Sequence, residues 1–240
     1  MTTRGKNALT ILGHSPLFAG IDPAGLRSMV EALDEEHWPK HRVVMLPGRE
    51  SDHVYVLLKG RVKISLHNDS GRELTLFLLG PGDVFNMECL LDRQEQEVLA
   101  QTLETVEAMS GPIELWTNWL DTIPPFRRAF RKYLEKRLRD LTELAGDLAL
   151  HDTMTRLVHL LLRYFNDGNK LKEHNLIEDL SHDELAHMIG TVRVVINRLL
   201  TELRHDAIID TKPGRLRVLN LQKLLQKADH HADVFSGLSQ

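Results

Sequence analysis

The sequence predicts an α+β protein of three successive parts. These are an N-terminal antiparallel β-roll of the jelly-roll type, a long helix, and a C-terminal helix-turn-helix followed by a hairpin. Short apolar runs separated by Gly, Pro and Asn recur at roughly ten-residue spacing between His37 and Glu107, as expected for such a roll. Leucines at helical spacing follow Pro124-Pro125, and a capped helix pair begins at Ser181. We place the three parts at residues 1–124, 125–150 and 151–240.

The composition narrows the class of protein. The chain has 240 residues, 42% hydrophobic and 27% charged, which is ordinary for a globular protein with two modest cores. A single cysteine, Cys89, excludes an internal disulfide framework, a four-cysteine iron–sulfur cluster and a zinc finger with paired cysteines. Its apolar runs are too short for a bilayer and the N-terminus lacks a signal peptide, so we expect no membrane partner and a cytoplasmic location.

The predicted roll is preceded by a short helix. Asp22 is suited to the N-cap and Pro23 to the first helical position, before a stripe of apolar side chains. The strands that follow are separated by Pro47-Gly48, Lys59-Gly60 and a polar turn starting at Asn68. We expect these strands at Val43–Leu46, Val54–Leu58, Arg61–Leu66 and Glu73–Leu79.

The long helix carries a pattern typical of a coiled-coil seam. Apolar residues recur at alternating spacings of four and three. This predicts a homodimer interface, and the alternative is an amphipathic helix that covers a core. The seam residues are Leu134, Leu138, Leu141, Ala145 and Leu148.

The C-terminal part has the local signals of two helices joined by a tight turn, after a helix expected at Thr153–Phe165. Ser181 and Glu184 form a capping box, which marks a helix start. Gly190 suits a turn that needs a positive φ angle. In the second helix, residues at i, i+4 and i+8 are expected to face inward: Val195, Leu199 and Leu203, with Ile196 and Leu200 widening the stripe.

The other face of that second helix predicts contact with double-stranded DNA. From residue 190 to 227 the chain has eight Lys and Arg against three Asp and Glu, which would attract phosphates. A recognition helix presents its N-terminal region to the major groove, where Arg pairs with guanine and Asn with adenine. Residues 207–219, after this helix, are expected to form a hairpin, the wing of a winged helix. Its Lys212 and Arg215 would contact DNA phosphates. The predicted DNA-binding residues are Ser181, Thr191, Arg193, Val194, Asn197, Arg198, Lys212 and Arg215.

The order of these parts resembles the Crp/Fnr superfamily of transcription regulators over residues 13–227. The residues that carry the resemblance are Ser15–Ile21, Tyr55–Ile64, Gly71–Phe85 and Leu180–Leu203. The resemblance implies a cyclic-nucleotide-binding-type roll, a dimer helix and a winged helix-turn-helix. It also implies a homodimer on a pseudo-palindromic DNA site, with recognition helices about 34–36 Å apart. RNA polymerase and a small-molecule or gas effector are the further partners that it implies.

The sequence departs from the family where cyclic AMP would bind. Members that bind it have Phe-Gly-Glu after the Gly-Asp turn and an Arg-Ser pair further on. Here Phe85 is followed by Asn86-Met87-Glu88, and Gln94–Glu97 lies where Arg-Ser is expected. An acidic segment opposes a cyclic phosphate, which needs a cation and free N–H groups. We therefore expect a regulator that does not respond to cyclic AMP, and a cyclic-nucleotide response is the alternative.

A haem-based sensor of NO, CO or O₂ is a second alternative. The family's haem-based carbon monoxide sensor has Cys and His just after the Gly-Asp-hydrophobic-Phe run, where this chain has Asn86 to Cys89. Met87, Cys89 and His151 are candidate iron ligands, although Met87 and Cys89 are also ordinary core side chains. The predicted effector pocket comprises Phe85, Asn86, Met87, Glu88, Cys89, Leu138 and Leu141.

Two further patterns limit the function. No nucleophile elbow, P-loop or His-Glu-x-x-His motif is present, and His182 and His187 point apart on a helix, so we expect no enzymatic activity. The resemblance places Glu at the position of Val194 in most members. Valine can contact a thymine methyl but cannot accept a hydrogen bond from cytosine, so the DNA half-site should differ from the common one there.

Overall fold

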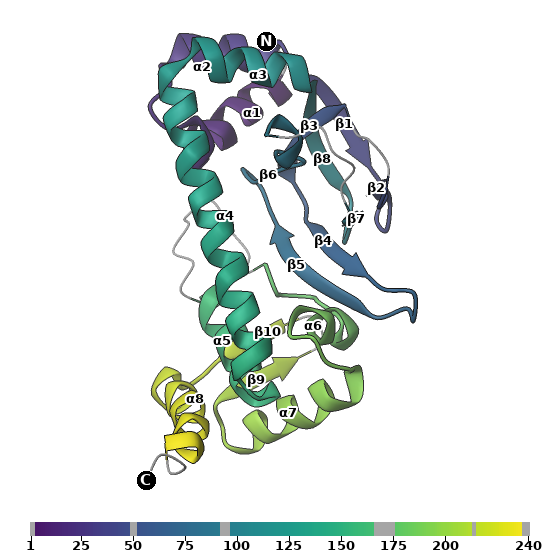
Figure 1. Ribbon diagram of the computed structural model, residues 1–240, viewed down its shortest axis with the longest axis vertical. Helices are drawn as coiled ribbons and strands as arrows, with labels where there is room; N and C mark the ends of the chain where they lie inside the picture. The colour runs from purple at the N-terminus through teal and green to yellow at the C-terminus, as the bar shows by residue number, and fades with distance from the viewer. Residues whose placement is uncertain (1–2, 49–51, 92–96, 166–175, 213–214, 237–240) are drawn as a thin grey trace. The chain divides into compact units, whose positions relative to one another are not determined.

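A computed structural model describes residues 3–48, 52–91, 97–165, 176–212 and 215–236 (Figure 1). The chain divides into two compact units by its internal contacts. The first comprises residues 1–67 and 77–140, and the second comprises residues 68–76 and 141–240. This division differs from the three parts expected from the sequence, because it assigns the two ends of one long helix to different units.

Helix α2 (Pro23–Glu31) of the first unit begins at a local signal. The Asp22 carboxylate accepts a hydrogen bond from the Gly25 N–H at 3.2 Å and caps α2, with Pro23 at the first position, as predicted. The helices at the N-terminus and before the long helix were not predicted. The elements are α1 (Thr3–His14), the 3₁₀ helix η1 (Pro16–Phe18), α2 (Pro23–Glu31), the 3₁₀ helix η2 (Glu88–Leu90), α3 (Ile113–Thr122) and the start of α4 (Pro124–Leu150).

Eight strands build the predicted antiparallel roll from two four-stranded sheets. One sheet has the order β1-β8-β3-β6 and the other β2-β7-β4-β5 (Figure 1). Gly60, with a φ angle of 80°, lies in the turn before Val62 and packs closely against the backbone, since a Cβ atom there would lie 2.5 Å from the Thr105 carbonyl oxygen. The strands are β1 (Asp34–Trp38), β2 (Val43–Met45), β3 (His53–Lys59), β4 (Val62–His67), β5 (Glu73–Leu79), β6 (Val84–Phe85), β7 (Leu99–Thr102) and β8 (Val106–Pro112).

The first unit has two apolar clusters. One fills the roll and includes Leu57, Val62 and Ala100. The other lies among the helices, where the Phe126 ring packs 5.8 Å from Phe18 and 6.0 Å from the Trp116 and Trp119 rings, measured between centroids. These aromatic contacts attach the start of α4 to its own unit, because rings of this size bury a large apolar area.

The second unit contains the end of α4 and the expected helix-turn-helix with its hairpin (Figure 1). Helix α5 has the predicted bounds. Helix α8 was not predicted, because the polar C-terminal sequence was interpreted as a tail. The elements are α5 (Thr153–Phe165), α6 (His182–Met188), α7 (Arg193–His205), β9 (Ile209–Lys212), β10 (Arg215–Val218) and α8 (Leu221–Ser236).

The inward stripe of α7 differs from the predicted one by a single position. Ile196, Leu199, Leu200 and Leu203 are buried, whereas Val195 is only half-buried. The buried stripe follows i, i+3, i+4 and i+7, which keeps one helical face toward the core, while a strict i+4 series drifts around the helix. Among the described residues, no helix has the length and apolar character needed to cross a membrane.

Candidate nucleic-acid interface

The first helix of the pair begins at a complete capping box. The Ser181 hydroxyl accepts a hydrogen bond from the Glu184 N–H at 3.1 Å, and the Glu184 carboxylate accepts one from the Ser181 N–H at 2.7 Å. Two of the N–H groups that a helix start leaves without helical partners are therefore satisfied. The helix start predicted from the sequence is therefore confirmed. The capping box fixes the residue at which α6, the helix before α7, begins.

The turn between α6 and α7 depends on Gly190. Its φ angle is 65°, as the sequence predicted, and a Cβ atom there would lie 2.6 Å from Cδ2 of Leu148. The Thr191 N–H donates to the Ala186 carbonyl at 2.9 Å, which closes the turn. Helix α7 then starts at Arg193, so its first turn begins only three residues after the glycine.

The N-terminal face of α7 is open to solvent. Val194 is 76% exposed, Arg193, Asn197 and Arg198 are exposed, and Thr191 is half-buried. Val192, just before the helix, is also exposed, at 62%, so two apolar side chains face solvent at this helix start. The structure thus brings the predicted base-reading residues of α7 onto one exposed helix end.

Two contacts on this face were not foreseen from the sequence. Nδ1 of His182 and Oδ1 of Asn197 are close neighbours, and Arg193 lies 3.3 Å from the Asp183 carboxylate. Both pairs join the start of α6 to the first turns of α7. Because they are exposed, they are weak, and contact with bases or phosphates would replace them at little cost.

The predicted wing is present as a two-stranded hairpin. Strands β9 and β10 pair antiparallel, with Ile209 opposite Val218 and Lys212 opposite Arg215. Arg217 is exposed on this hairpin. The tip, residues 213–214, and the side chains of Lys212 and Arg215 lie outside the described part of the chain, so their expected phosphate contacts stay predictions.

Helix α8 is attached to the C-terminal end of α7 by ion pairs. The Lys227 ammonium lies 2.8 Å from carboxylate oxygens of both Glu202 and Asp206. Its hydrogen bond lowers the pKa of Asp206 below the usual value, and the same hydrogen bond is the main cause that raises the pKa of Lys227. This attachment orients α7 from the end opposite to its exposed N-terminal face.

The residues predicted to line an effector pocket are divided between the two clusters of the first unit. Phe85 belongs to the roll cluster, and Met87 and Cys89 belong to the helical cluster. Asn86 has a φ angle of 62°, and its amide donates to the His53 carbonyl at 2.8 Å. Glu88 is exposed. Phe85, Met87 and Cys89 therefore pack within apolar clusters, and the effector pocket stays a prediction.

Of the candidate haem ligands, Met87 and Cys89 belong to the helical cluster of the first unit. The Cys89 thiol is buried and donates to the Asn86 carbonyl at 2.6 Å, and Met87 is fully enclosed. His151 belongs to the second unit, where its ring lies 5.1 Å from the ring of His159. His159 was not singled out from the sequence.

Aromatic side chains occupy the roll near β6. The Tyr55 and Phe85 rings are stacked with centroids 5.0 Å apart, and Trp38 packs edge-on against Tyr55 at 5.4 Å. These rings belong to the roll cluster or pack against it. Trp38, Tyr55 and Phe85 thus form one group of contacting aromatic rings in the roll.

A buried tyrosine connects β6 to α4. The Tyr133 hydroxyl accepts a hydrogen bond from the Val84 N–H at 3.1 Å and donates to the Val84 carbonyl at 3.0 Å. Arg137 donates to the same hydroxyl and stacks over the Phe77 ring at 4.5 Å. Burial raises the pKa of Tyr133 to about 12, so the hydroxyl keeps its proton at neutral pH.

The predicted seam on α4 is partly exposed. Leu138 is 68% exposed and Leu141 36%, Ala145 is exposed, and Leu134 and Leu148 are half-buried. Leu134 packs against the helical cluster of the first unit. Leu138 and Leu141 therefore expose apolar surface along the predicted seam, and the dimer interface stays a prediction.

Two family models match the chain in the order of its parts. The cyclic nucleotide-binding domain matches residues 35–122, and the Crp-like helix-turn-helix domain matches residues 155–227. The global nitrogen regulator of Synechococcus elongatus is 31% identical over 199 residues, which cover 81% of this chain and 90% of that protein. The chain belongs to the Crp/Fnr family of transcription regulators.

Other Crp/Fnr relatives agree along nearly the whole length. The CRP-like cAMP-activated global transcriptional regulator of Mycobacterium tuberculosis is 25% identical and covers 91% of this chain and 98% of its own. A solved structure of a CooA mutant from Carboxydothermus hydrogenoformans has a TM-score of 0.70 at 25% identity, covering 82% of this chain and 88% of that one. The helix-turn-helix of this Crp/Fnr regulator is therefore its DNA-binding element.

Proposed function

We propose that this Crp/Fnr regulator acts as a homodimer on a pseudo-palindromic DNA site and responds to an effector other than cyclic AMP. The observation that carries the DNA-reading part is the exposed N-terminal end of α7, where Arg193, Val194, Asn197 and Arg198 share one face. In helix-turn-helix proteins these positions face base edges in the major groove.

Arg198 and Asn197 are the residues to which we assign direct base reading. Both are exposed, one turn after the start of α7. An arginine can donate two hydrogen bonds to guanine, and an asparagine can pair with adenine once it releases His182. Val194 offers only apolar contact, which favours a thymine methyl at its base pair.

The DNA test compares three arginine variants on a site recovered by binding selection. Arg198→Ala should lower specific affinity by about 1–3 kcal/mol, because one bidentate base contact is lost. Arg215→Ala should weaken binding to all sequences and flatten the salt dependence, because a phosphate contact is lost. Arg204→Ala, further along α7, is the matched control and should change little. An unchanged affinity in Arg198→Ala would refute the assignment.

Val194 is tested by the preferred sequence instead of the affinity. Selection with the wild type should return a half-site that differs from the common family one at a single base pair. Val194→Glu should shift the preference there toward cytosine, since a carboxylate accepts from the cytosine amino group. Recovery of the same base with both proteins would contradict the assignment.

The seam of α4 supports the homodimer. Leu138 and Leu141 are exposed at coiled-coil spacing, and burial of both on a partner would remove apolar surface from water. Sedimentation should show a dimer for the wild type and a monomer for the double variant Leu138→Lys, Leu141→Lys. Leu150→Lys is the control, because Leu150 is 75% exposed on the same helix but off the seam. A dimer that persists in the double variant would place the interface elsewhere.

The packing near β6 supports an effector other than cyclic AMP. The aromatic stack of Trp38, Tyr55 and Phe85 occupies the roll, and Asn86-Met87-Glu88 supplies no cation for a phosphate. The curated Mycobacterium relative is named as cAMP-activated, so calorimetry with cyclic AMP is the direct test. We expect no heat of binding, and micromolar affinity would refute this part of the proposal.

The visible absorption spectrum of protein from haem-replete cells separates a gas sensor from a small-molecule regulator. Met87 and Cys89 are buried in an apolar cluster, so we expect a colourless protein. A Soret band that disappears in Cys89→Ala would instead assign Cys89 as an iron ligand.

A further inference from the structure

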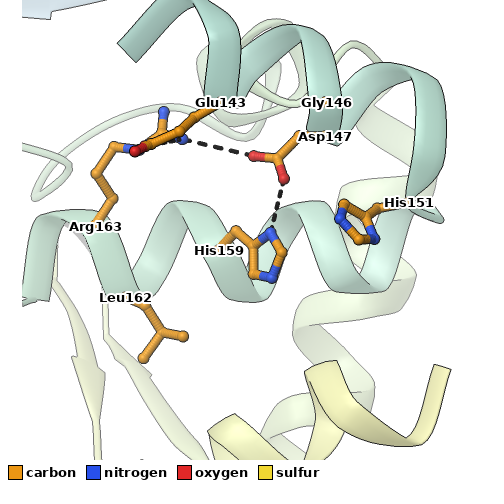
Figure 2. A pocket seen from close by; sticks show the side chains of 7 residues that line it. All are labelled: Glu143, Gly146, Asp147, His151, His159, Leu162 and Arg163. Carbon is orange, nitrogen blue, oxygen red and sulfur yellow. Dashed lines mark hydrogen bonds and ion pairs between the residues drawn. The ribbon is translucent and has the colours of Figure 1, made fainter. Parts of the chain in front are cut away.

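The last turns of α4 and the middle of α5 place three potential metal ligands together (Figure 2). They are Asp147 and His151 on α4 and its end, and His159 on α5. One ligand atom from each lies within 4.8 Å of the others, and all three residues are half-buried. From this arrangement we propose that the second unit binds a divalent first-row transition-metal ion through Asp147, His151 and His159.

The spacing of the three residues fits a shared ion. Asp147 and His151 are four residues apart, so they lie on the same side of the helix end. Zinc-type ions bind His nitrogen and carboxylate oxygen at about 2.0–2.2 Å in tetrahedral geometry, so two ligand atoms on one ion are about 3.3–3.6 Å apart. The widest pair of ligand atoms, at most 4.8 Å apart, needs to close by up to about 1.5 Å, and the Asp147–His159 pair needs to open from 2.7 Å. Side-chain rotation can supply both changes.

The ligand types favour a particular class of ion. Two imidazoles and one carboxylate suit Zn²⁺, Co²⁺ or Ni²⁺, whereas Mg²⁺ and Ca²⁺ prefer oxygen atoms alone. Nδ1 of His159 lies 2.7 Å from Oδ1 of Asp147, a distance at which one proton is shared between them. A metal ion would replace that proton, as metal binding to His generally does.

The surroundings leave room for the ion and its remaining ligands. The three residues line a cavity of about 520 Å³. Gly146 also lines it, and a Cβ atom at Gly146 would meet nothing within 4 Å, so the opening is not obstructed on that side. Three protein ligands with space for water match the open type of coordination site.

The charges around the cavity are compatible with a cation. Arg163 lies 3.5 Å from the Asp147 carboxylate and 3.6 Å from the Glu143 carboxylate. Glu143 therefore offsets the arginine, and the three charged side chains Glu143, Asp147 and Arg163 together carry one net negative charge. Figure 2 shows Arg163 on the side of Asp147 away from His151, so it approaches the carboxylate from the opposite direction to the site.

The binding test uses the full chain with Co²⁺ or Zn²⁺ alone. Because His230 and His231 are adjacent in the sequence, the background protein contains His230→Ala and His231→Ala, which removes that alternative site. We expect one equivalent of Co²⁺ with a visible d–d band, and we expect Zn²⁺ to raise the melting temperature, since a ligand stabilises the state that binds it.

The variants locate the ion. His151→Ala and Asp147→Asn should each weaken Co²⁺ binding at least about tenfold and abolish the rise in melting temperature. His14→Ala, an exposed histidine of the first unit, is the matched control and should bind as the background does. Circular dichroism confirms that each variant is folded, and Asp147→Asn preserves the side-chain shape.

Two results would overturn the proposal. Absence of a Co²⁺ band and of a Zn²⁺ shift would mean that Asp147 and His159 form an ion pair only. Binding that survives both His151→Ala and Asp147→Asn would place the ion elsewhere. Neither result depends on DNA binding or on dimerisation, so the proposal is tested separately from the proposed function.

Discussion

The two ends of α4 are held by different kinds of contact. In the first unit, Phe126, Phe130 and Tyr133 are buried, with the Phe126 ring among three other aromatic rings. In the second unit, Leu144 is the one buried residue of the stretch 141–150, and Asp147 is connected to α5 through His159 and Arg163.

This difference determines how each end responds to its surroundings. Apolar burial is strong and insensitive to ions, so the N-terminal end of α4 should be a stable part of its unit. Half-exposed polar pairs are weak and depend on salt, protons and metal ions. The C-terminal end, which precedes the DNA-binding helices in the chain, is therefore the end that solution conditions can change.

The largest expected effect is at Phe126. Phe126→Ala should lower the free energy of unfolding of the first unit by about 3–5 kcal/mol, because a large cavity forms among the rings. Denaturant unfolding followed by tryptophan fluorescence measures it, since Trp116 and Trp119 pack against this ring. Arg128→Ala, an exposed neighbour on the same helix, should change stability by less than about 0.5 kcal/mol. Similar losses of stability in Phe126→Ala and Arg128→Ala would show that burial of the Phe126 ring does not hold this end of α4.

Tyr133 should give the next largest effect, with a distinct pH dependence. Tyr133→Phe removes the hydroxyl that bonds to Val84 and Arg137, and should lower the free energy of unfolding by about 1–3 kcal/mol at neutral pH.

The pKa of Tyr133 is raised by burial from 10.0 to about 12, so the folded state favours the protonated hydroxyl. Its contribution is complete below pH 10.0 and is lost as the pH rises toward about 12. The difference in stability between wild type and Tyr133→Phe should therefore shrink over this interval. A difference that stays constant would show that the hydroxyl does not titrate in this range.

At the other end of α4, Asp147→Asn should have a smaller effect without added metal. The side chains of His159 and Arg163, which pair with Asp147, are each about a third exposed. Loss of both pairs should therefore lower the free energy of unfolding by about 1 kcal/mol or less. Thermal unfolding at low and high salt measures it, and the difference from wild type should decrease at high salt. A loss as large as that of Phe126→Ala would mean that both ends are held equally strongly.

The smallest effect is expected at Lys136. Its ammonium lies 2.9 Å from the Asp140 carboxylate four residues later, on an exposed part of α4. Lys136→Ala should change stability by about 0.2–0.5 kcal/mol, as exposed pairs at this helical spacing do. A measured change above about 1 kcal/mol would indicate a further contact of Lys136, for example with a second chain.

Helix starts and tight turns were predictable because their causes are local. Ser181 with Glu184, Asp22 with Pro23, and Gly190 each act within four residues, and each has the predicted role. Helices α1 and α3 were missed, because no such signal was recognised in their sequences and their formation depends on packing. The two-residue strand β6 likewise exists through its pairing with β3. Helix α8 was missed although Asn220 caps it, with its side-chain oxygen accepting a hydrogen bond from the Lys223 N–H at 2.9 Å.

The candidate sites show the same division. The exposed end of α7 followed from helical periodicity, although burial shifted its inward stripe from Val195 to Ile196. The proximity of Asp147 to His159 has no local cause, because the two residues lie on different helices. The one local signal for this cluster is the spacing of Asp147 and His151, because residues i and i+4 lie on the same face of a helix.

The sequence by itself determined the order of the parts, the caps, the glycine turn and the residues on the exposed face of α7. These depend on backbone preferences and on side chains a few residues apart. Tertiary structure alone decided that Phe85 and Met87 belong to different clusters, that Tyr133 bonds to Val84, and that His159 joins Asp147 and His151. Such contacts depend on how helices and strands pack, which no local pattern encodes.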